Sequence, residues 1–115
     1  MARKRILNAM KRLEIVCERE CLPAIQMMLD YHATGYTVVP GLSGFGHHGR
    51  RDGDIIAVVT VVTLDHVDPI IDQLMPLLDK YSGIVTIGDV NVLRGEYFTP
   101  ECTGKPIAAL ESTGL

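Results

Sequence analysis

The sequence predicts an α+β domain in which four strands and two helices follow one another in the order βαββαβ. Three observations support this prediction: short runs rich in β-branched residues, two longer segments with apolar residues at helical spacing, and glycines placed where each helix should end. The order is that of a ferredoxin-like fold, a split βαβ arrangement with one antiparallel sheet and two helices on one face. The expected strands cover residues 13–17, 36–39, 55–63 and 84–93, and the expected helices cover residues 21–33 and 67–81.

The first half of the chain supplies one strand, one helix and a second strand. Residues 13–17 show a partly alternating apolar pattern, which is typical of a strand. The helix after it is predicted from apolar residues on one helical face, namely Leu22, Ile25, Leu29 and Ala33. Pro23 suits its first turn and Gly35 its end. We expect the next strand to end at Pro40, because proline has no N–H group for the ladder.

The second half repeats the pattern. The uniformly apolar run from Ile55 to Thr63 predicts a strand that is covered along much of its length. The apolar face of the second helix then spans Val67 to Tyr81, and Ser82-Gly83 ends it. Pro76 lies inside this pattern, so we expect a kink or a shortened helix.

Composition places the chain among single-domain soluble proteins. It has 115 residues, 47% of them hydrophobic and 22% charged, with a formal net charge of −3. An acidic balance of this kind argues against general nucleic-acid binding. The odd number of cysteines, three, indicates reduced thiols in a cytoplasmic protein and not a set of disulfides. No apolar run reaches the roughly 18 residues that would cross a bilayer. We therefore expect a cytoplasmic protein without direct membrane insertion.

A sheet with helices on one face leaves its other face uncovered. The run from Ile55 to Thr63 is apolar at nearly every position, so both of its faces need cover. Packing against identical copies is the simplest way to supply it. The sequence therefore predicts self-association.

The segment from Gly41 to Gly49 carries the clearest functional pattern. Its four glycines allow backbone N–H groups to converge on a ligand, and Arg50 and Arg51 follow with guanidinium groups that suit a carboxylate or phosphate. A second segment, Ile87-Gly88-Asp89, resembles a turn within the last strand, and Arg94 stands at that strand's end. Together they predict an anion or nucleotide cleft.

Catalytic and metal-binding alternatives have weaker support. Ser43 lacks the strand–turn–helix context of an activated nucleophile, although Asp52 or Asp54 could pair with a histidine for proton transfer. His47 and His48 could instead bind a metal ion in a ferredoxin-like trimeric metal-binding or ion-tolerance protein, which is the main alternative function. Adjacent side chains on an extended backbone point in different directions, however, so one site rarely uses both. We therefore expect a protein that is not an enzyme and holds no metal.

Two segments resemble those of PII signalling proteins. Gly35-Tyr36-Thr37-Val38, followed by Gly44-Phe45-Gly46, is similar to the second strand and loop base of that family. Residues 81–95, Tyr-Ser-Gly-Ile-Val-Thr-Ile-Gly-Asp-Val-Asn-Val-Leu-Arg-Gly, resemble the PII-like subgroup linked to inorganic carbon, which includes carboxysome-associated PII proteins and regulators of bicarbonate transporters. The resemblance implies an N-terminal arm at residues 1–10, a PII-like domain at 11–98 and a C-terminal extension at 99–115.

The resemblance also implies a homotrimer that binds adenine nucleotides in the clefts between subunits. Thr37 would lie against the base, and the backbone of Gly44, Phe45 and Gly46 would contact the ligand. The segment from His47 to Asp54 would read out ligand state, and it includes the five residues His47, His48, Gly49, Arg50 and Arg51. From the opposing side the contributors would be Thr86, Ile87, Gly88, Asp89 and, at the phosphates, Arg94.

Departures from the family pattern reduce the set of candidate nucleotides. Val90-Asn91 stand where classical PII proteins carry a Gly-Lys pair for the triphosphate, and the readout loop is short. The resemblance thus favours ADP, AMP or cyclic AMP over ATP. Bicarbonate is a second candidate ligand, since its planar oxygens match the guanidinium group of Arg50 or Arg51. The implied role is regulation of inorganic-carbon uptake or carboxysome function, with a bicarbonate transporter or a carboxysome-associated protein as partner.

Overall fold

The computed structural model describes residues 7–33 and 35–93, and it confirms the predicted order of elements. The strands are β1 (Leu7–Glu18), β2 (Thr37–Gly46), β3 (Gly49–Val62) and β4 (Ile84–Leu93). The helices are α1 (Leu22–His32) and α2 (Val67–Tyr81), and a short 3-10 turn precedes each of them, at Arg19–Cys21 and Leu64–His66.

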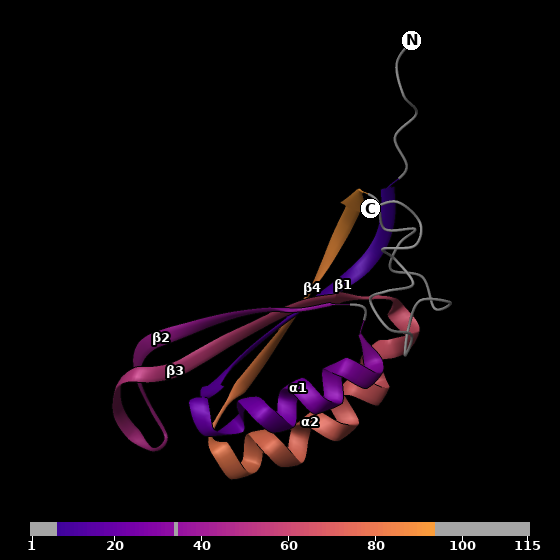
Figure 1. Cartoon of the computed structure of the whole chain (residues 1–115). Helices are drawn as coiled ribbons and strands as arrows, with labels where there is room; N and C mark the ends of the chain where they lie inside the picture. The colour runs from indigo at the N-terminus through magenta and orange to yellow at the C-terminus, as the bar shows by residue number, and fades with distance from the viewer. Residues whose placement is uncertain (1–6, 34, 94–115) are drawn as a thin grey trace.

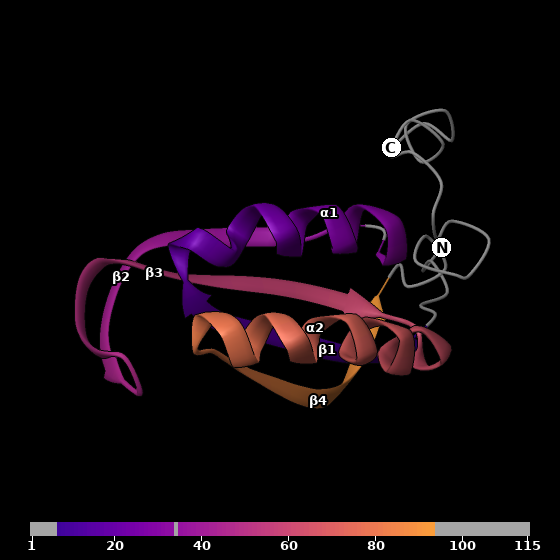
Figure 2. The same ribbon diagram turned by 90° about the horizontal axis from the view of Figure 1, so that it is seen from below.

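The four strands form one antiparallel sheet in the spatial order β2-β3-β1-β4. Both helices lie on the same face of this sheet, as Figures 1 and 2 show. The strands β1 and β3 are central, while β2 and β4 are the two edges. The predicted ferredoxin-like α+β fold is therefore confirmed.

The core lies between the sheet and the helices. Alternate residues of the central strands face the helices, and the apolar faces of the helices pack against them. The side chains that are almost wholly buried there include Leu13, Ile15, Cys17, Ile25, Leu29, Ile56, Val58, Ile70 and Leu74. Thr60 shares this face, and its hydroxyl donates a 2.6 Å hydrogen bond to the Gly35 carbonyl, which satisfies its polar atom.

The opposite face of the sheet carries no helix or strand of the described residues. It presents Val16 from β1, Ile55, Val59 and Val61 from β3, and Ile84 from β4. Ile84 is 62% exposed, and the other four are half-buried. The uncovered apolar face expected from the sequence is thus present.

Several boundaries differ from the prediction. The strand expected to begin at Leu13 begins at Leu7, because β4 extends far enough to pair Leu7 with Leu93. The helix containing Pro76 is not shortened and continues to Tyr81. Its end at Ser82 is as predicted, with this residue in the left-handed conformation at φ 55°.

The largest error concerns the glycine segments, which are strands and not loops. Strand β2 continues past Pro40 to Gly46, and Gly49 to Asp54 belong to β3. Gly88 lies within an uninterrupted β4, opposite Arg12. The predicted turn at residues 87–89 was therefore wrong.

Candidate functional site

The β2–β3 hairpin projects beyond the rest of the sheet. The pairing of β3 with β1 stops at Ile55, opposite Glu18, so residues 49–54 have no partner in β1, and Gly49, Arg50 and Arg51 pair with β2. Two register shifts interrupt the ladder between Val39 and Gly44, and Gly41 takes a φ of +72° there. Such bulges bend a strand. Figure 1 shows the hairpin bending toward the side of the sheet on which the helices lie.

The tip of the hairpin is a two-residue turn. Gly46 pairs with Gly49, which leaves only His47 and His48 between the strands. Gly49 has a φ of +85°, a conformation that favours glycine. The segment from His47 to Asp54, which was expected to be a readout loop, is thus a turn at His47-His48 followed by strand.

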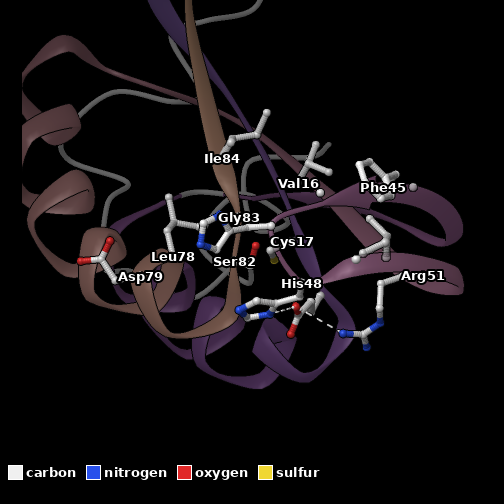
Figure 3. A pocket seen from close by; sticks show the side chains of 16 residues that line it. Val16, Cys17, Phe45, His48, Arg51, Leu78, Asp79, Ser82, Gly83 and Ile84 are labelled. Atoms are coloured by element: carbon white, nitrogen blue, oxygen red, sulfur yellow. Dashed lines mark hydrogen bonds and ion pairs between the residues drawn. The ribbon is translucent and has the colours of Figure 1, made fainter.

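A pocket of about 540 Å³ lies between the hairpin tip and the body of the molecule (Figure 3). This volume is within the range of small-molecule sites. The hairpin contributes Gly44 to Gly49 and Arg51, the end of β1 contributes Val16 to Glu18, and Ile55 comes from β3. The opposite wall comes from the end of α2 and the start of β4, with Leu78, Asp79, Ser82, Gly83 and Ile84.

Gly83 allows α2 and β4 to approach β1 closely at this wall. A Cβ at this position would lie 2.7 Å from the Cβ of Cys17, 2.8 Å from Leu78 Cδ2 and 2.9 Å from the Val16 carbonyl oxygen. Real Cβ atoms essentially never show contacts below 3.0 Å. The glycine is thus required for packing, beyond its predicted role of ending the helix.

An ionic cluster joins the hairpin to the body. His48 Nδ1 contacts a carboxylate oxygen of Glu18, and Arg51 lies 3.2 Å from the same oxygen. Arg51 also donates to Glu20 at 3.0 Å and to Asp54 at 2.7 and 2.9 Å. In Figure 3, dashed lines run from His48 and Arg51 to one carboxylate between them.

These contacts shift the pKa values of two groups in the cluster, Asp54 and Arg51. Hydrogen bonds from Arg51 lower the pKa of Asp54, so its carboxyl group is ionised at neutral pH. The hydrogen bonds to Asp54 and then to Glu20 raise the pKa of Arg51. Because three carboxylates surround one guanidinium group, Arg51 is already paired and does not project freely as the sequence suggested.

The pocket brings together only part of the predicted site. Its walls include the predicted Gly44, Phe45, Gly46, His47, His48, Gly49 and Arg51. Arg50 is exposed and pairs with Phe45 in the ladder, outside the lining. Arg94 lies outside the described residues.

The remaining predicted residues lie along the two edges of the sheet. Thr37 begins β2, whereas Thr86, Ile87, Gly88 and Asp89 are on β4, with β3 and β1 between them. Asp89 also pairs with Lys11. Within one subunit, Thr37 therefore lies across the sheet from residues 86–89.

The structure gives less support to the alternative metal and nucleophile sites than to the pocket. The rings of His47 and His48 lie 6.1 Å apart and tilted by 47°, and His48 is engaged by Glu18. Within residues 7–33 and 35–93, no group of three or more potential metal ligands is found. The Ser43 hydroxyl accepts a 2.9 Å hydrogen bond from the Gly53 amide and has no histidine partner among the described residues. No described helix is long and apolar enough to cross a membrane.

Sequence reasoning missed Glu18. It is 7% exposed although ionisable, and it follows the apolar run Ile15-Val16-Cys17 at the end of β1, next to the pocket. A charged residue that directly continues a buried apolar strand was the available signal. Its partners, however, lie 30 and 33 positions later, so the sequence alone could not identify them.

Comparison with known proteins defines the family. The profile described as "Nitrogen regulatory protein P-II" matches residues 10–97, while no curated protein sequence matches. CPII from Thiomonas intermedia K12, bound to ADP and bicarbonate, is 31% identical with a TM-score of 0.76; the alignment covers 82% of this chain and 98% of CPII. Another CPII structure, bound to ADP, AMP and bicarbonate, gives 28% identity, a TM-score of 0.71, and coverage of 84% and 95%.

A more distant structure supports the fold alone. The GlnK–ATP complex of B. subtilis is 16% identical, with a TM-score of 0.55, and the alignment covers 71% of this chain and 82% of GlnK. The P-II profile, by contrast, spans 88 of the 115 residues, counted from 10 to 97 inclusive. From the sheet order, the glycine-based hairpin and these matches we conclude that the chain belongs to the nitrogen regulatory protein P-II family and is a PII-like protein of the CPII subgroup.

Proposed function

We propose that this protein is a non-enzymatic, cytoplasmic signalling protein that binds an adenine nucleotide at the clefts of a homotrimer. The observation that carries the proposal is the pocket lined by Gly44, Phe45 and Gly46, the segment that the family resemblance implies would contact the ligand. Similar CPII structures hold ADP with bicarbonate, and one holds both ADP and AMP. ADP, AMP and cyclic AMP are therefore the ligands to test first.

The position of the predicted contacts supports a site between subunits. Thr37 and the residues 86–89 occupy opposite edges of one sheet. A neighbouring copy that placed its β4 edge beside the β2 edge of the first would unite them. Ring closure of such heterologous contacts is a general route to cyclic oligomers.

The uncovered sheet face supports the same assembly. Val16, Ile55, Val59 and Val61 form an apolar surface on a sheet whose helices are all on the other side. Burial of such a surface is favourable by about 25 cal/mol per Å². Three copies that packed these faces together would remove them from water.

Bicarbonate is the proposed second ligand, and the ion pairs indicate which arginine is available for it. Arg51 is surrounded by Glu18, Glu20 and Asp54, whereas Arg50 on the neighbouring position is exposed and has no ion-pair partner among the described residues. Arg50 is therefore the arginine that a planar anion can reach while Arg51 remains paired. A CPII structure holds bicarbonate together with ADP, which supports coupling of the two ligands.

Regulation of inorganic-carbon uptake or of the carboxysome is the proposed physiological role, with the hairpin as the surface that docks. Phe45 supports docking, since it is 79% exposed near the tip, where large apolar side chains often mark a contact surface. Capture of a bicarbonate transporter or a carboxysome protein from native cells should depend on Phe45. A Phe45→Ser variant that captured the same proteins equally well would contradict this role of the tip.

Ligand binding is tested by titration calorimetry with ADP, AMP, cyclic AMP and ATP, each with and without bicarbonate at constant pH and ionic strength. We expect binding of at least one of the first three, weaker binding of ATP, and tighter nucleotide binding when bicarbonate is present. Light scattering coupled to gel filtration should give three times the 12.6 kDa chain mass. Absence of nucleotide binding by a well-folded trimer would refute the proposed function.

A size series at Gly88 tests where the ligand lies. No atom lies within 4 Å of a Cβ built at this position, and its φ is not positive, so Gly88→Ala and Gly88→Val should fold normally. A nucleotide that packs against β4 would be displaced progressively by the methyl and isopropyl groups. Equal affinities across the series, in variants that remain trimeric, would remove Gly88 from the site.

A further inference from the structure

The hairpin tip is attached to the body of its own subunit by very few polar side-chain contacts. Among the described residues, these contacts run from His48 and Arg51 on the hairpin to Glu18 and Glu20 on the body. Glu18 ends β1 and takes part in two of them, one with each hairpin residue. It is therefore the common point through which the tip is held.

Glu18 depends on these partners. Only 9% of its side chain is exposed, and both partners recorded for its carboxylate, the His48 ring and the Arg51 guanidinium group, come from the hairpin. A buried carboxylate without partners is strongly unfavourable. Opening of the hairpin would remove both partners of this carboxylate, so these contacts favour the closed position of the hairpin.

The closed state also fills the position that an anionic ligand would need. Three carboxylates, from Glu18, Glu20 and Asp54, surround the single guanidinium group of Arg51. Asp79 adds a further carboxylate to the pocket wall. A carboxylate presents the same pair of oxygens as bicarbonate and resembles one edge of a phosphate. In this state Glu18 stands where such a group would bind.

We propose that Glu18 is an internal competitor for anions: it closes the hairpin over the pocket by binding His48 and Arg51, and an anionic ligand group opens the hairpin by replacing it. The inference deepens the proposed function, because it names the regulation of that same site. Its chemistry is shared by bicarbonate and by the phosphates of a nucleotide. After replacement, the Glu18 side chain turns to solvent and the tip is free to dock elsewhere.

The closed half of this proposal is tested without any ligand, by hydrogen–deuterium exchange of the full-length protein. In Glu18→Gln, which keeps the shape and removes the charge, amides of residues 44–54 should exchange about fivefold faster than in the wild type. Glu20→Gln is the matched control, because it removes one carboxylate from Arg51 but leaves Glu18 with both partners. It should change exchange less than twofold.

His48→Ala provides a second variant in case the buried substitution impairs folding. Its side chain is 44% exposed in a turn, so the domain should fold, and the tip should again exchange faster than in the wild type. Unchanged exchange in both Glu18→Gln and His48→Ala would overturn the proposal. Faster exchange in both, with Glu20→Gln near the wild type, would support it.

The opening half is tested by calorimetry, with ADP and bicarbonate in separate titrations and chloride at equal ionic strength as the control anion. Removal of an internal competitor should tighten anion binding. The Glu18→Gln variant should therefore bind whichever of ADP or bicarbonate replaces Glu18 about fivefold more tightly than the wild type does. Which titration shows the gain identifies the source of the anion. Weaker or equal affinity for both would overturn the competition.

The two proposals fail in different ways. If no nucleotide binds any variant, the proposed function fails, while exchange at residues 44–54 still decides whether Glu18 holds the hairpin. If nucleotide binds normally but Glu18→Gln and His48→Ala exchange like the wild type, the internal competitor fails and the proposed function stands.

Discussion

Substitution of Gly83 by alanine should destabilise the protein through a clash at one defined point. The new Cβ would lie 2.7 Å from Cys17 Cβ, 2.8 Å from Leu78 Cδ2 and 2.9 Å from the Val16 carbonyl oxygen. The Leu78 methyl group ends a flexible side chain and can move. The other two atoms belong to the central strand β1 or are attached directly to it, so they cannot move without shifting the sheet.

The expected magnitude follows from two opposing effects. Overpacking of a tight contact costs about 1–3 kcal/mol, and three contacts below 3.0 Å place Gly83→Ala near the upper end. Replacement of glycine by alanine also restricts the unfolded chain, which offsets about 0.4–1 kcal/mol. The free energy of unfolding should therefore fall by about 2 kcal/mol, which corresponds to about 8 °C in Tm for a domain of this size.

The measurement is urea denaturation at one fixed protein concentration, since the stability of an oligomer depends on concentration. Gly88→Ala is the control, because its Cβ would meet nothing within 4 Å; it should be neutral or slightly stabilising. The double variant Gly83→Ala/Leu78→Ala should be less stable than Leu78→Ala alone, because the two contacts with β1 persist. A Gly83→Ala midpoint as high as that of Gly88→Ala would refute the packing argument.

Three further predictions concern ionisable groups. Burial raises the pKa of Cys17 to about 12, so mass spectrometry should find its thiol unmodified by iodoacetamide at pH 8 unless denaturant is present. Hydrogen bonds from Arg51 lower the pKa of Asp54 in the folded protein. The stabilising contribution of Asp54 is therefore present above its unfolded-state pKa and is lost as the pH falls through its lower folded-state pKa. Below about pH 4, the urea midpoint of the wild type should fall more steeply than that of Asp54→Asn. The ion pair of Lys11 with the 86% exposed Asp89 should contribute little, so Asp89→Asn should change the free energy of unfolding by less than about 1 kcal/mol in the same assay.

Local patterns in the sequence predicted the order of elements because helical spacing and β-branched runs reflect burial against a single core. The end of α2 at Ser82 was also predicted correctly, because Ser82-Gly83 is a local signal that does not depend on a distant partner. The strand boundaries were less predictable because a strand extends as far as its partner does. Leu7 belongs to β1 only because β4 reaches Leu93, and the sequence near Leu7 carries no sign of that partner.

The hairpin shows how composition can mislead. Four glycines and a proline predicted a loop, but paired backbone needs only a partner strand, and bulges accommodate residues such as Gly41. Pro40 is tolerated because β2 is an edge strand, where a missing N–H leaves no neighbour unpaired. The residue types of the site could thus be predicted, whereas the pairing of Arg51 with three carboxylates required the fold.

Within residues 7–33 and 35–93, no strand pairs with the outer edge of β2 or of β4, and this has a consequence for solubility. Strand β4 is ten residues long, and Asp89 is its only charged residue. An edge of this kind, unpaired in water, is a template for uncontrolled strand addition and fibrous aggregation. Assembly that seals the edges would therefore act as the chain's own protection. Dilution or mutation that releases single subunits should lead to precipitation, not to a population of stable soluble monomers.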